Sequence, residues 1–73
     1  MSTWTTSTFG ELRRGARFRF PGEDVTNVVT GVTDRYTDKH GTWIVVTSRG
    51  GDTGRPHGKS AYLADDPVEV LED

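Results

Sequence analysis

The fold is decided by residues 9–20, which read Phe9-Gly10-Glu11-Leu12-Arg13-Arg14-Gly15-Ala16-Arg17-Phe18-Arg19-Phe20. A short turn bounded by glycines leads into a run in which aromatic and basic residues alternate. Side chains of a strand point alternately to its two faces. The run therefore predicts a strand at residues 16–20 of a small antiparallel β domain. Its phenylalanines, Phe18 and Phe20, should face a core, and its arginines, Arg17 and Arg19, should face solvent.

The residues ahead of this strand predict a single helical turn. Thr8, followed three residues later by Glu11, has the pattern of a capping box, and Leu12 can anchor one turn. Gly15 then ends the turn early, so we expect a 3₁₀ or α turn rather than a helix.

Four further strands are expected along the rest of the chain. Residues 25–36 are rich in β-branched side chains, and Gly31 within them marks a bulge or a bend. Residues 42–47 form the most apolar strand. The Gly-rich segment 48–58 is expected to be a long loop. The last two strands are expected at residues 59–63 and 68–71, the final one at an edge of the sheet.

This pattern favours an all-β fold, a small five-stranded, SH3-like, partly open barrel with one short N-terminal helical turn. The barrel domain is expected to span residues 8–73, after a flexible polar leader at residues 1–7 whose Trp4 docks back on the body. An OB-fold is less favoured, because no segment is long and periodic enough for the helix expected between its third and fourth strands.

Length and composition set the class of protein. The chain has 73 residues, enough for one domain with a small core. It contains no cysteine, so neither a disulfide nor a thiolate metal site can supplement that core. No run approaches the roughly 18 apolar residues that a membrane span needs, and the first residues lack the pattern of a signal peptide. We therefore expect a cytoplasmic protein without a membrane partner.

Charge is unevenly distributed along the chain. The net charge is −2, but residues 1–60 carry nine Lys and Arg against six Asp and Glu, whereas residues 61–73 carry five acidic residues and no basic one. Such bipolarity suggests a basic surface and an acidic edge that can steer partners of either sign, but a solvated surface of mixed charge is the favoured interpretation. If the acidic C-terminal strand lies alongside the Arg17/Arg19 face, it should neutralise that face.

No catalytic or metal-binding pattern stands out. Residues 58–60 read Gly-Lys-Ser, the end of a phosphate-binding loop, but Thr53 stands where that loop needs its first glycine, and a strand follows instead of a helix. His40 and His57 are the only histidines, too few for a structural zinc site. No motif places a serine nucleophile beside a histidine. We expect a protein that is not an enzyme and that needs no cofactor or metal.

Binding residues are expected in the loop 49–59 and on the basic face of the first strand. The candidate ligand-binding side chains are Arg49, Arg55, His57, Lys59, Trp43, Tyr62, Arg17 and Arg19. Basic groups neutralise phosphates and aromatic rings stack on bases, so this set supports a nucleic-acid-binding barrel. The interspersed acidic residues and a pI near 5.6 disfavour that interpretation.

A protein partner is therefore slightly preferred. Barrels with open edges can bind an extended peptide or take up an added strand. A small binding module for protein–protein interaction is the first hypothesis, a nucleic-acid-binding module using loop 49–59 the second, and a purely structural or assembly protein the third.

The pattern Phe9-Gly10-Glu11-Leu12-x-x-Gly15-x-x-Phe18-x-Phe20, a Val-rich second strand and a final Val68-Glu69-Val70-Leu71 resemble the small SH3-like β-barrel proteins of actinobacteria and their bacteriophages. The resemblance covers about residues 8–72 and rests on turn and core positions. It implies a small accessory protein that acts by binding, on host machinery in the case of a phage protein. It carries no ligand residues over to this chain.

Overall fold

The alternating segment at residues 17–19 forms a strand in the interior of the sheet, with neighbours on both sides. We describe residues 3–72 from a computed structural model of the chain. In chain order, its elements are β1 (Thr3–Thr8), the 3₁₀ helix η1 (Phe9–Glu11), β2 (Arg17–Arg19), β3 (Asn27–Asp38), β4 (Gly41–Gly50), β5 (Pro56–Leu63) and β6 (Pro67–Glu72). The all-β fold class is confirmed.

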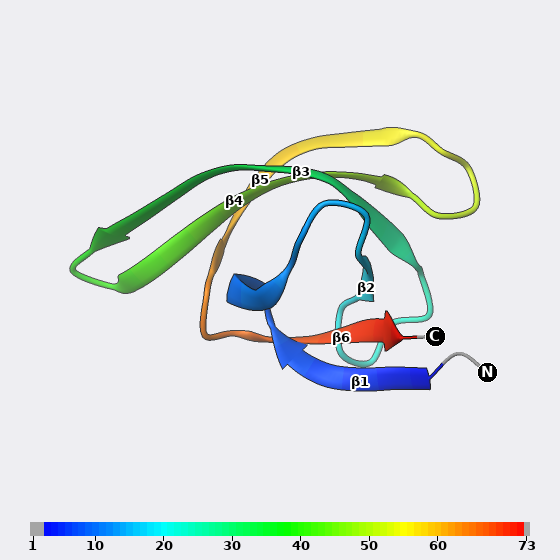
Figure 1. The fold of residues 1–73 in the computed structure, drawn as a ribbon, viewed down its shortest axis with the longest axis horizontal. Helices are drawn as coiled ribbons and strands as arrows, with labels where there is room; N and C mark the ends of the chain where they lie inside the picture. Colours follow the sequence, from blue (N-terminus) through cyan, green and yellow to red (C-terminus); the bar gives the residue numbers. More distant parts are fainter. Residues whose placement is uncertain (1–2, 73) are drawn as a thin grey trace.

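All six strands belong to one antiparallel sheet with the order β1-β6-β2-β3-β4-β5. The sheet curls but does not close, so β1 and β5 are its two edges. In Figure 1, β3, β4 and β5 arch over η1, β2 and β6, and the β3–β4 hairpin projects beyond the rest of the chain. One end of the curl is held by η1, where the amide of Gly10 donates to the carbonyl of Ala64 at 2.9 Å.

The core occupies the concave side of the sheet. Its buried apolar side chains are Phe9, Leu12, Phe18, Val29, Ile44, Val46 and Val68. Phe18 is 1% exposed and Phe20 is partly buried, so both phenylalanines of the alternating run face the core as expected. Tyr62 joins them, because its ring stacks on Phe9 with 4.2 Å between centroids.

The local expectations at the first turn and at Gly31 are confirmed in part. Residues 9–11 form one 3₁₀ turn, as the early glycine predicted. The capping box is wrong, since the side chain of Thr8 makes no capping hydrogen bond. The register of β3 against β4 shifts between Val29 and Gly31, and again between Val32 and Asp34, so the predicted bend is built from two irregularities.

The structure differs from the expected five strands at its N-terminal edge. The segment assigned to a polar leader, residues 1–7, contains most of β1, which pairs along its whole length with β6. Because β1 covers β6, the last strand lies inside the sheet rather than at the edge that we expected. Trp4 does dock on the body, since the guanidinium of Arg19 lies 4.1 Å from its ring centroid.

The expected loop at residues 48–58 is also much shorter in the structure. Strand β4 continues to Gly50 and β5 already begins at Pro56, so only residues 51–55 form the connection. Gly54 and Gly58 adopt positive φ angles of 70° and 73°, one in the turn and one inside β5. The glycines therefore shape a tight hairpin and an irregular strand instead of a flexible loop.

Candidate functional site

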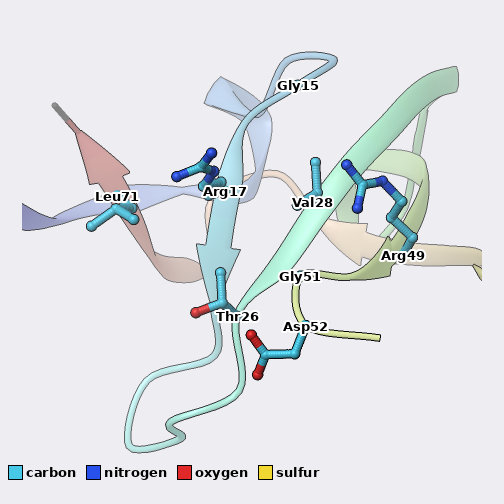
Figure 2. Close-up of a pocket in the computed structure, with 8 residues that line it drawn as sticks. All are labelled: Gly15, Arg17, Thr26, Val28, Arg49, Gly51, Asp52 and Leu71. Carbon is cyan, nitrogen blue, oxygen red and sulfur yellow. The ribbon is translucent and has the colours of Figure 1, made fainter. Parts of the chain in front are cut away.

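A groove lies on the convex face of the sheet, where β2, β3 and β4 run side by side (Figure 2). It has a volume of about 540 Å³. Its lining residues are Gly15, Arg17, Thr26, Val28, Arg49, Gly51, Asp52 and Leu71. We call it the outer groove. It is shallow and open, which suits part of a macromolecule better than a small molecule, because small-molecule sites enclose most of their ligand.

Strand register places two arginines on opposite sides of this groove. Arg17 on β2 lies directly opposite Val28 on β3, and Val28 lies directly opposite Arg49 on β4. Directly opposed residues share a face, so all three side chains point to the convex side. Figure 2 shows the two guanidinium groups on either side of Val28. Their Cα atoms are two strand spacings apart, or about 10 Å.

Both arginines are available for a ligand. Arg17 and Arg49 are exposed, and neither forms an ion pair with another residue in the described range 3–72. Asp52, the one acidic residue of the lining, is exposed. Val28 lies between the two unpaired guanidinium groups, and Leu71 lies beside Arg17 on the side of β6, so groups that can bind anions have apolar neighbours here.

Arg19 has a different role, although it follows Arg17 on the same face of β2. Its Nε donates to Oε1 of Glu69 at 3.2 Å and its Nη2 donates to Oε2 at 3.3 Å. Its guanidinium also covers the ring of Trp4. The expected neutralisation by the last strand is therefore confirmed for Arg19 alone. This arginine is held in place by its own fold and is not part of the outer groove.

A second hollow opens on the concave side, between β5 and the turn that joins β2 to β3. It has a volume of about 260 Å³. Its lining residues are Phe18, Phe20, Glu23, Val25, Asn27, Ser48, His57, Ser60 and Tyr62. We call it the mouth pocket. Two of the predicted site residues, His57 and Tyr62, lie here and not beside Arg49 in the outer groove.

The predicted aromatic platform for nucleic-acid bases is not assembled. Tyr62 stacks on Phe9 on the concave side. Trp43 belongs to the convex face of the projecting β3–β4 hairpin, where it pairs across strands with Tyr36 and stacks on it at 6.3 Å. Neither ring lines the outer groove. Arginine and aromatic side chains that are close in sequence are thus separated by the strand arrangement.

The remaining predicted site residues line neither hollow. Arg55 lies in the β4–β5 connection, and Lys59 lies on β5 opposite Thr47, both of them exposed. Sequence reasoning missed Val28 and Leu71 in the outer groove and Asn27 in the mouth pocket. Only the pairing of strands reveals their positions, because each was expected to be an ordinary strand residue.

A comparison of the chain with protein-family models, curated proteins and solved structures finds no match. Within residues 3–72, no helix is long and apolar enough to cross a membrane. In the same range, His, Asp and Glu side chains do not gather in groups of three that could hold a metal ion.

Proposed function

We propose that the chain is a small, non-enzymatic, SH3-like binding module whose outer groove binds an acidic segment of a protein partner. The observation that carries this proposal is the pair Arg17 and Arg49, which face solvent without an ion-pair partner in residues 3–72 on either side of Val28. Arginine binds carboxylates through two parallel hydrogen bonds. Val28 and Leu71 between and beside the two arginines supply contact for apolar side chains next to the acidic ones.

A protein partner fits this groove better than a nucleic acid. The groove has no aromatic side chain on which a base could stack. The chain as a whole carries a net charge of −2, whereas nucleic-acid-binding modules are usually basic. An acidic peptide brings fewer charges than a phosphate backbone, and its apolar side chains match the apolar residues of the groove.

Binding measurements with two classes of probe test the proposal. The probes are a peptide of alternating glutamate and leucine and mixed-sequence single- and double-stranded nucleic acids, each titrated at low and moderate salt. The variant Arg17→Gln/Arg49→Gln should weaken peptide binding at least about tenfold, because charge-assisted hydrogen bonds are each worth about 1.5–3 kcal/mol. The control Lys39→Gln/Arg55→Gln removes the same charge outside the groove and should bind like the parent protein.

Each alternative has its own signature in this experiment. Nucleic-acid binding that falls steeply with salt and is lost in Arg17→Gln/Arg49→Gln would contradict the proposed protein partner. It would identify the ligand of the outer groove as a nucleic acid. Equal losses in the groove variant and its control would show that only net charge matters, and the outer groove would then have no specific role.

A further inference from the structure

The mouth pocket combines aromatic rings with hydrogen-bond acceptors, a different chemistry from the outer groove. Phe18 forms its base, while Phe20 and Tyr62 are partly exposed along its wall. The centroids of the Phe20 and Tyr62 rings are 5.8 Å apart, with their planes inclined at 51°. Phe9 covers one face of Tyr62, so only the opposite face of that ring is free for a ligand. Ring faces carry partial negative charge and attract cations.

A nearly buried amide faces the same pocket without a full set of partners. Asn27 is 7% exposed, and it is the only buried polar side chain among residues 3–72. Its Nδ2 donates one long hydrogen bond, of 3.5 Å, to the carbonyl of Val25. The hydrogen bonds within residues 3–72 include none to its carbonyl oxygen, Oδ1, and this oxygen is not one of the buried atoms that lack a partner there. Oδ1 therefore keeps contact with solvent and is open to a donor from a ligand in the pocket.

The margin of the mouth pocket carries a negatively charged side chain, which would attract a cation. Glu23 lines the pocket from the β2–β3 turn and is exposed, and it forms no ion pair in residues 3–72. Ser48 and Ser60 add two hydroxyl groups that can accept hydrogen bonds. His57 is the one side chain of the lining that can carry positive charge. It is the extra residue at a register shift, because Ser48 pairs with Gly58 and Arg49 pairs with Pro56.

We infer that the mouth pocket binds a cationic side chain, the ammonium group of a lysine or the guanidinium group of an arginine. Such a side chain places its apolar stem against Phe20 and Tyr62 and its donors toward Asn27 and Glu23. An anionic side chain would meet the carboxylate of Glu23. A purely apolar side chain would offer no donor to Oδ1 of Asn27 and no charge to Glu23.

This inference goes beyond the proposed function, because it concerns another pocket and the opposite ligand charge. The two sites are nevertheless continuous around one end of the sheet. Between them lies a hollow of about 250 Å³ lined by Val25, Thr26, Gly50, Gly51, Asp52, Thr53 and His57. It shares Thr26, Gly51 and Asp52 with the outer groove, and Val25 and His57 with the mouth pocket.

Small capped amino acids test the cation site without any knowledge of the partner. N-acetyl-lysine methylamide and its arginine counterpart are titrated into isotope-labelled protein, beside the neutral norleucine and the anionic glutamate compounds. In NMR spectra, we expect the two cations to change the chemical shifts of the Asn27 side-chain amide and of the Phe20 and Tyr62 rings, and these changes should saturate. Norleucine should bind more weakly, and glutamate should cause no saturable shift.

A matched pair of variants completes the test. Glu23→Gln should weaken lysine binding about two- to fivefold, the range of an exposed ion pair. Asp24→Asn removes the same charge one residue away, outside the lining, and should leave binding unchanged. Both positions are exposed, so neither substitution should disturb the folding of the core. The inference is overturned if norleucine binds as tightly as lysine, if glutamate binds better, or if none of the compounds shows saturation. These measurements concern the mouth pocket and do not depend on Arg17 or Arg49. The proposed function of the outer groove is therefore tested separately.

Discussion

Glu69 accepts two hydrogen bonds from the guanidinium of Arg19, at 3.2 Å from Nε and 3.3 Å from Nη2. The two residues lie directly opposite each other on β6 and β2. Because the same guanidinium covers the ring of Trp4, one arginine connects β2, β6 and β1. The connection helps to hold a polar edge strand such as β1 on the sheet, since three of its six residues are exposed and none is buried.

Replacing this arginine should loosen the N-terminal edge of the sheet. We expect Arg19→Ala to lower the free energy of unfolding by about 1–2 kcal/mol, the sum of a partly exposed ion pair and one cation–π contact. For a domain of this size that corresponds to a fall in Tm of roughly 4–16 °C. Urea unfolding measures the change. Arg17→Ala is the control on the same strand face and should stay within about 0.5 kcal/mol, since its side chain has no partner in residues 3–72. Equal losses in the two variants would contradict the distinct roles that we assign to them.

Removal of the Phe18 side chain should strongly destabilise the core. Phe18 is 1% exposed and its ring meets Phe9 and Phe20 edge-on. Phe18→Ala should cost about 3–5 kcal/mol, much of the stability that so small a domain possesses. Circular dichroism during thermal unfolding should show a largely unfolded protein near room temperature. Val25→Ala, at a position that is 62% exposed, serves as the comparison and should unfold near the parent temperature.

Closure of the curled sheet at η1 depends on a close approach at Gly10. A Cβ atom at this position would lie 3.0 Å from the Cβ of Ala64 and 3.2 Å from its carbonyl oxygen. That carbonyl also accepts the hydrogen bond from the amide of Gly10. Gly10→Ala should therefore lower stability by about 1–3 kcal/mol through overpacking. Gly31→Ala is the matched variant, because its Cβ would meet only the hydroxyl of Thr47, at 3.3 Å. If Gly31→Ala lowers the free energy of unfolding more than Gly10→Ala does, the close approach of Gly10 to Ala64 does not limit the closure of the sheet.

The sequence predicts those strands whose own side chains have an apolar face. The alternation at Phe18 and Phe20 is of this kind, and it predicted both the strand and its orientation. β1 has no such face, since five of its six residues are threonine or serine and only Trp4 is large and apolar. Its strand conformation comes from pairing with β6, a contact between the two ends of the chain that local pattern cannot reveal.

The candidate site illustrates the same limit. Along the chain, Arg49 belongs with Arg55 and Lys59, and the sequence grouped them as one basic loop. In the sheet, the partner of Arg49 is Val28, and the next strand brings Arg17. Alternation within β4 is enough to predict which face Arg49 occupies. It does not predict which strand lies beside β4, and this neighbour decides what the site contains.

The free edge of β5 leads to a last prediction, on association between copies of the chain. β5 pairs with β4 on one side only, and most of its residues are exposed. Two copies that paired edge to edge in antiparallel order around Lys59 would bring two ammonium groups close together, and charged residues on edge strands oppose such pairing. Lys59→Val should therefore cause concentration-dependent dimerisation or aggregation in sedimentation velocity, whereas Lys39→Val, on the turn of the β3–β4 hairpin, should sediment like the parent protein. If Lys59→Val remains as dispersed as the parent at every concentration, another feature protects the edge, such as the register shift that places His57 out of pairing.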